Sequence, residues 1–148
     1  MPTILETMRS NMREAMKARE AERLGTIRLL LASINGVEKD KGRELTDEEV
    51  TDILTTEAKK RREAAAAYRD GHRLELAEKE DGELEVILTY LPKQLTDEEV
   101  GAIVDEVIAS TGASSKAEMG KVMGPVMARV KGRFDGSRVK DIVMAKLG

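Results

Sequence analysis

The side chains best suited to surface chemistry form a basic, glycine-containing segment near the C-terminus. The segment from Lys131 to Gly136 reads KGRFDG, so two cations and the chain's only phenylalanine lie between or beside glycines. Glycine lets backbone amides approach a phosphate closely, and an exposed phenylalanine can stack on an unpaired base. Phe134 could equally fill a small core beneath the loop. The candidate RNA-binding residues are Lys121, Arg129, Lys131, Gly132, Arg133, Phe134 and Arg138.

A second basic run lies in the middle of a predicted helix and comprises Lys59, Lys60, Arg61 and Arg62. Because each residue turns the helix by about 100°, four consecutive cations must go around it. One interpretation is a solvated face whose aliphatic stems lie along the bundle. The other is a second basic contact patch.

From Met119 to Val130, apolar residues recur at the three- and four-residue spacing of one helix face. The methionines in this stripe, Met119, Met123 and Met127, have flexible thioethers that could line a groove for a partner helix. The stripe could also be the core of a small helical unit. Burial of the methionines would remove the basis for the groove.

Residues typical of catalysis or metal binding form no recognised pattern. The chain has no cysteine, and its one histidine, His72, lies in a predicted turn. No P-loop, dinucleotide fingerprint, HExxH motif or nucleophile elbow is present. The carboxylates gather at helix starts, where capping explains them. We therefore expect a non-catalytic protein without a cofactor or a metal ion.

Net charge is distributed unevenly along the 148 residues. Residues 113–148 contain eight Lys or Arg and three Asp or Glu, whereas residues 1–112 contain seventeen and twenty-five. A basic tail on an acidic body favours contact with nucleic acid, although charge also varies along ordinary solvated helices.

The composition predicts an all-α protein. Helix-forming residues dominate, alternating β-branched runs are absent, and only Tyr68, Tyr90 and Phe134 are aromatic. So few rings also argue against a single-strand stacking platform, and favour recognition of a folded RNA. Charges interrupt every apolar run, so we expect no signal peptide, no membrane span and a cytoplasmic location.

The spacing of apolar residues predicts four helices before Pro92 and three after it. We therefore expect an N-terminal helical domain over residues 1–92 and a three-helix tail over residues 93–148. The same hexapeptide, LTDEEV, occurs at 45–50 and 95–100 and predicts a capping box with a hydrophobic staple at two helix starts. The segment Asp70-Gly71-His72 is expected to form a helix C-cap and turn, with Gly71 free to take a left-handed conformation.

Within the tail, Ser115 and Glu118 predict another capping box, and Pro125 should kink or split the helix that follows. Gly120 and Gly124 are four residues apart, so we expect them to allow close approach of a neighbouring helix.

Several separated motifs resemble the YqeY proteins. They are the run from Tyr90 to Leu95, YLPKQL, then GASSKAEMGKVMG at residues 112–124 and VKGRFDGS at residues 130–137. The KKRR run and the segment RLEL at residues 73–76 match as well. The resemblance covers essentially the whole chain.

YqeY proteins are similar to the C-terminal part of GatB, the transamidase subunit that handles mischarged tRNA. Residues 120–135 follow the pattern of the GatB tail, which contacts the tRNA body, although Pro125 and Ala128 depart from it. The resemblance implies a GatB/YqeY-like helical protein with tRNA, or a tRNA-handling enzyme, as its partner. The amide-transfer activity belongs to the GatB catalytic portion, which this chain lacks. The alternative hypothesis is a protein-interaction module that does not bind RNA.

Overall fold

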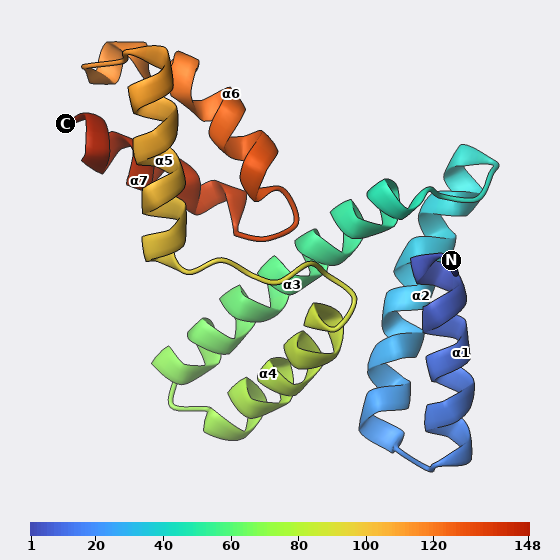
Figure 1. Ribbon diagram of the computed structural model, residues 1–148. Helices are drawn as coiled ribbons and strands as arrows, with labels where there is room; N and C mark the ends of the chain where they lie inside the picture. Colours follow the sequence, from blue (N-terminus) through green and yellow to red (C-terminus); the bar gives the residue numbers. More distant parts are fainter. The chain divides into compact units, whose positions relative to one another are not determined.

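The computed structural model describes all 148 residues and confirms the all-α class. The chain divides into two compact units, Met1–Leu91 and Pro92–Gly148, which are described separately (Figure 1). The first contains α1 (Ile4–Lys17), α2 (Ala21–Lys41), α3 (Asp47–Asp70) and α4 (Leu74–Leu88). The second contains α5 (Asp97–Thr111), a 3-10 turn η1 (Lys116–Glu118), α6 (Met119–Val130) and α7 (Gly136–Leu147).

Threonine caps set the starts of three helices. The Thr3 hydroxyl accepts a hydrogen bond from the Glu6 amide at 3.1 Å. Thr46 and Thr96 each form the predicted capping box, in which the hydroxyl accepts from the N3 amide and the N3 glutamate accepts from the threonine amide. Satisfying these otherwise unpaired amides explains why α3 and α5 begin where they do.

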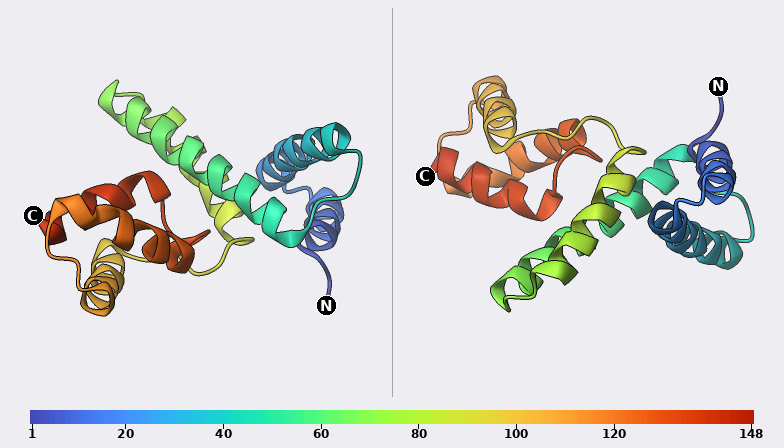
Figure 2. Two further views of the ribbon diagram at one scale, coloured as in Figure 1. Left: turned by 90° about the horizontal axis from the view of Figure 1, so that it is seen from above. Right: turned by 90° about the horizontal axis from the view of Figure 1, so that it is seen from below.

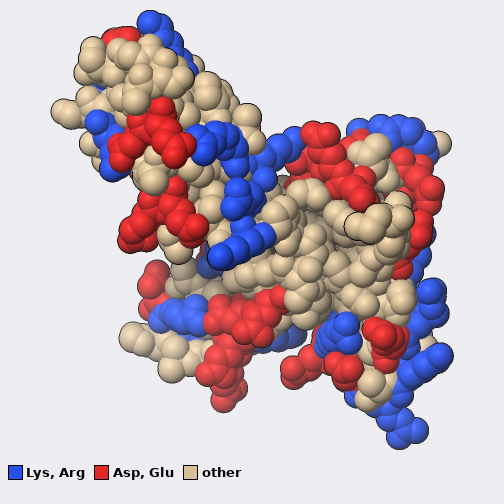
Figure 3. Space-filling view, in the orientation of Figure 1, with Lys and Arg blue, Asp and Glu red and all other residues tan.

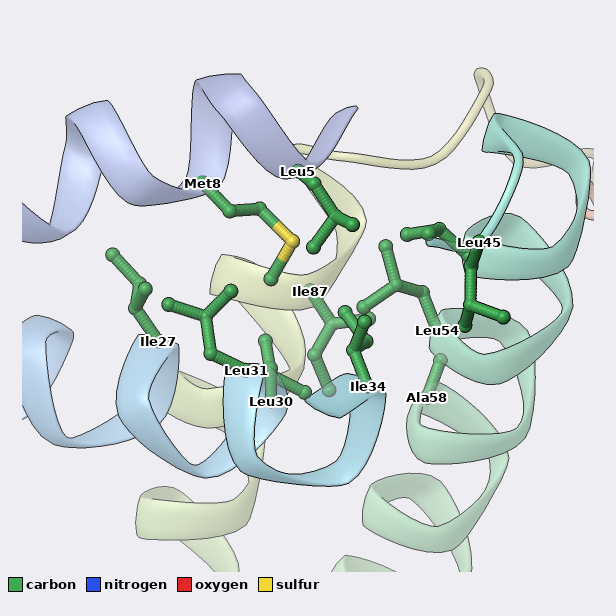
Figure 4. Packing of buried hydrophobic residues seen from close by; sticks show 11 residues of the cluster. Leu5, Met8, Ile27, Leu30, Leu31, Ile34, Leu45, Leu54, Ala58 and Ile87 are labelled. Carbon is green, nitrogen blue, oxygen red and sulfur yellow. The ribbon is translucent and has the colours of Figure 1, made fainter. Parts of the chain in front are cut away.

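The core of the N-terminal unit is aliphatic and draws on all four helices (Figure 4). The α1–α2 pair packs against the first half of α3 and the end of α4. Asn11 donates a hydrogen bond to the Tyr90 hydroxyl at 2.7 Å, which ties α1 to the residues after α4. The buried side chains are Leu5, Met8, Ile27, Leu30, Leu31, Ile34, Leu45, Val50, Leu54, Ala58 and Ile87.

The far halves of α3 and α4 run antiparallel beyond the α1–α2 pair (Figure 2). Small residues, Ala65 and Ala77, form the buried contact there. Leu74 at the start of α4 is 61% exposed because no third helix covers this end of the hairpin. An exposed ion pair between Arg69 and Asp81 joins the two helices instead.

The core of the C-terminal unit is built mainly from valines at helical spacing. Val122, Val126 and Val130 form the buried face of α6. They pack against Val100, Val104 and Val107 of α5 and Val139 and Val143 of α7. The predicted stripe of α6 is therefore the seam of this unit.

Three local expectations in this unit are corrected or refined. Ser115 makes no capping bond, and the residues after it form η1, while Ser114 donates to the Glu118 carboxylate instead. Pro125 lies inside α6 without splitting it. Gly120 and Gly124 face open space, so no neighbouring helix approaches them. The stripe turns its valines inward, which leaves these glycines on the opposite side.

The end of α3 is closed by a left-handed histidine and not by a left-handed glycine. Gly71 has φ −85°, whereas His72 has φ 58°. The Arg73 amide donates to the Tyr68 carbonyl at 2.7 Å and the His72 amide to the Arg69 carbonyl at 3.0 Å. These are the two bonds of a Schellman motif with His72 at the C′ position.

Replacing His72 by glycine should stabilise the protein, because glycine reaches the left-handed region without a Cβ clash. We expect the free energy of unfolding to rise by about 0.5–1 kcal/mol in urea denaturation. Gly71→Ala is the matched control, and it should not destabilise because Gly71 has an ordinary φ. Destabilisation by Gly71→Ala without a gain from His72→Gly would contradict this assignment.

Candidate functional site

The loop between α6 and α7, residues 131–135, is fastened to the segment that enters α5. The Gln94 side chain donates to the Gly132 carbonyl at 2.9 Å, and the Leu95 amide donates to the Arg133 carbonyl at 2.7 Å. The Arg133 Nε donates to the Lys93 carbonyl at 3.2 Å. Gly132 itself is buried with φ 75°, a conformation that favours glycine.

This fastening brings three cations together from two distant stretches of chain. Lys131 and Lys93 are exposed, and Arg133 is half-buried. Lys93 and Arg133 both lower the pKa of Glu99, after the larger effect of its hydrogen bonds to Thr96. Lys93 was not among the predicted site residues, because nothing local in the sequence links it to the loop.

Phe134 fills the core beneath the loop. It is 7% exposed and belongs to the valine cluster of the C-terminal unit. The Arg138 guanidinium lies 5.1 Å from the centre of its ring and also pairs with Asp97 at 2.6 Å. Of the two roles considered for Phe134, packing is the one that the structure shows, and a buried ring offers no face to a base.

The remaining predicted cations of this unit pair with carboxylates at the surface. Lys121 lies 3.4 Å from Glu118, and Arg129 lies 2.6 Å from Glu106 on α5. Basic and acidic side chains are interspersed on the face of the molecule seen in Figure 3. Exposed pairs of this kind contribute little to stability, so a phosphate could replace the carboxylate at small cost.

The methionines of α6 mostly serve the core. Met119 and Met123 are half-buried against the valine cluster, and Met127 is 38% exposed with its methyl group beside Gly136. A groove lined by all three methionines is therefore not open to a partner helix.

The second basic run does not form a single surface patch. Glu57 is buried, and its carboxylate pairs with Arg61 and accepts from the Ser33 hydroxyl at 3.1 Å. Arg61 also donates through Nε to Glu83 at 3.3 Å, so it links α3 to α4. Lys59 is 4.0 Å from Glu63, and Lys60 is exposed. Because the run goes around the helix, its cations face different surroundings.

The shifted pKa values in the chain come from helix caps and from the interhelical charged cluster formed by Glu57, Arg61 and Glu83. Hydrogen bonds from Arg43 and Thr46 hold the pKa of Glu49 well below its usual range. Bonds from Ser114 and Lys121 lower the pKa of Glu118. Burial, and then the neighbouring Glu83, raise the pKa of Glu80. These shifts reflect helix starts and packing, and they mark no cluster of acids and bases in a cleft.

The structure is that of a small all-helical protein. It has two compact units, an interhelical charged cluster and a basic loop held by hydrogen bonds. Its sequence matches the Yqey-like protein family over residues 5–147, so the chain belongs to that family. It is 28% identical over 96 residues to an uncharacterized protein of Schizosaccharomyces pombe, covering 65% of this chain and 78% of that one. It is 26% identical over 151 aligned residues to altered inheritance of mitochondria protein 41, mitochondrial, of Pyrenophora tritici-repentis, covering 97% and 82%. None of its helices has the length and apolar character needed to span a membrane.

Removing the arginine of the interhelical cluster should destabilise the N-terminal unit strongly. Arg61→Met leaves the Glu57 carboxylate buried without its charged partner, and we expect a loss of about 3 kcal/mol in the free energy of unfolding. Lys60→Met, at an exposed neighbouring position, is the control and should change it by less than about 0.5 kcal/mol. Urea denaturation measures both, and equal effects would show that the cluster does not hold the helices.

Replacing Glu80 by glutamine should raise the thermal unfolding midpoint at pH 7. Its pKa is raised in the folded protein, so its stabilising protonated form is present below about pH 4, the unfolded pKa, and is lost as pH rises. The variant and the parent should therefore converge in acid. Glu85→Gln, at an exposed position of the same helix, is the control. A gain for Glu80→Gln that persists unchanged at pH 3.5 would point to a cause other than ionisation.

Proposed function

We propose that this protein is a non-catalytic accessory protein that binds tRNA through the loop of its C-terminal unit. The observation that carries the proposal is the fastening of residues 131–135 to residues 93–95, which gathers Lys93, Lys131 and Arg133 around one loop. A basic loop held by hydrogen bonds to residues 93–95 meets a phosphate backbone with little loss of conformational entropy.

The resemblance of residues 120–135 to the GatB tail supports tRNA over other nucleic acids. The arrangement of charge supports contact with phosphates and not with bases, because Phe134 and Gly132 are buried and the exposed groups are the cations Lys93 and Lys131. The proposal accordingly assigns the loop a role in recognising the body of a folded tRNA, with Lys121, Arg129 and Arg138 exchanging carboxylates for phosphates at its flanks.

The cellular compartment in which the protein would bind tRNA is a prediction from the sequence. The cytoplasm is the expectation from the sequence, while one relative carries a mitochondrial name. Both compartments contain tRNA, so the binding proposal is compatible with either.

Replacing Lys93 and Lys131, the two exposed cations gathered at the loop, should weaken tRNA binding and reduce its dependence on salt concentration. For Lys93→Gln with Lys131→Gln, we expect the slope of log K against log salt to fall by about two, since each lost phosphate contact removes about one. The measurement is a titration of the purified full chain against total tRNA at several salt concentrations, with a duplex RNA of equal length for comparison.

The matched control is Lys60→Gln with Lys79→Gln, which removes the same charge from exposed positions of the N-terminal unit. This control should leave the slope unchanged. Equal slopes for the parent and the loop variant, or no saturable binding of tRNA at low salt, would refute the loop as a tRNA contact.

A further inference from the structure

The surface of the N-terminal unit carries a groove between α1 and α2 that the proposed tRNA contact does not use. The groove encloses about 360 Å³. Its floor is apolar, formed by Met12, Leu31 and Ala32, and its rim carries Arg9, Arg13, Arg28 and Asn35. A second hollow beside it, of about 440 Å³, shares Arg9 and Arg13 and contains Glu6, the one carboxylate among the residues that line either depression.

The three rim arginines have no acidic partner within the chain. Arg61, Arg69, Arg129 and Arg138 each pair with a carboxylate, whereas Arg9, Arg13 and Arg28 make neither an ion pair nor a hydrogen bond with their side chains. Arg19 and Arg73 also make no ion pair or side-chain hydrogen bond, but neither lines the groove or the hollow beside it, so Arg9, Arg13 and Arg28 are the unpaired arginines that gather at this one site. Their guanidinium groups are free to bind an anion.

The positions of these arginines do not help the helices that carry them. Arg9 and Arg13 are four residues apart on α1, and like charges at this spacing destabilise a helix. Folding alone therefore gives no reason for the pair. An acidic ligand in the groove would convert the repulsion into attraction.

The outer face of α2 next to the groove carries mostly small side chains. Gly25, Leu29, Ala32 and Gly36 recur at four-, three- and four-residue spacing, so they share one face, and Ala32 belongs to the groove as well. A Cβ added at Gly25 or Gly36 would meet nothing within 4 Å, and Leu29 is 54% exposed. This face offers apolar contact and leaves room for another helix backbone beside the arginine rim.

We propose that the α1–α2 groove docks an acidic amphipathic helix of a partner protein. Arg9 and Arg13 are separated by about 6 Å along the α1 axis, since each residue rises 1.5 Å, and two carboxylates one turn apart on the partner helix match this spacing. Apolar side chains of the same helix would cover Met12 and Leu31. Arg28 would pair with an acidic residue on the opposite flank, completing a helix-in-groove contact.

The floor of the groove favours such a helix over RNA. A phosphodiester chain would satisfy the arginines but would bring no apolar side chain to Met12, Leu31 and Ala32. The groove also lacks an aromatic residue on which a base could stack. Charge and apolar floor together fit an amphipathic peptide.

The test is photocrosslinking of the full chain in its native host, with p-benzoylphenylalanine in place of Ala32. The control site is Ala66, an exposed alanine of α3 outside the groove. We expect an adduct at Ala32 and not at Ala66, mapping by mass spectrometry to an acidic amphipathic segment of another protein. Arg9→Glu with Arg13→Glu should lower its yield at least tenfold, and lysines in place of the partner's facing acids should restore it.

A control of equal charge change separates docking from general electrostatics. Lys17→Glu with Lys60→Glu, at exposed positions outside the groove, should leave the yield unchanged, and circular dichroism verifies that each variant folds. The proposal would be overturned if adducts formed only with RNA or only with a second copy of this chain. It would also be overturned if the adduct yield at Ala32 were no higher than at Ala66. A yield unaffected by reversal of the arginines would overturn it too. Loss of the loop cations Lys93 and Lys131 should not alter the adduct, so this test is independent of tRNA binding.

Discussion

The capping boxes at Thr46 and Thr96 fix the register on which both units depend. Each box satisfies amides at the start of the helix and sets the residue at which that helix begins. The preceding leucine then packs beside the first buried valine, as Leu45 does with Val50 in the N-terminal core. With the start fixed, the 3.6-residue period determines which side chains of α3 and α5 turn inward. A helix that began at a different residue would lose the reciprocal bonds of the capping box.

The two units use charge in different ways. In the C-terminal unit, cations pair with carboxylates on adjacent helices, and the loop of residues 131–135 is held by hydrogen bonds to residues 93–95. In the N-terminal unit, Arg61 is committed to a buried cluster, while Arg9, Arg13 and Arg28 surround an apolar groove without partners. The proposed tRNA loop and the proposed docking groove therefore lie on separate units.

The family assignment and the structure constrain the function to different degrees. Membership of the Yqey-like family covers nearly the whole chain. The structure adds what the family match does not contain, namely which cations are free, which are committed to ion pairs, and which apolar surfaces are open. Phe134 and Arg61 illustrate this, since both are attractive ligand-binding residues in sequence and both prove to be parts of the packing.

Features that depend on neighbours a few residues away can be predicted from the amino-acid sequence. The all-α class, the threonine caps and the apolar stripe of α6 belong to this group, because a cap spans three residues and a helix face repeats every three or four. Features that depend on contacts between distant segments become visible only in the folded structure. It placed Lys93 beside the 131–135 loop, buried Phe134, left Gly120 and Gly124 facing open space, and gave the left-handed conformation to His72. It also brought Arg9 and Arg13 of α1 beside Arg28 of α2, because only the packing of one helix on another determines which surfaces remain uncovered.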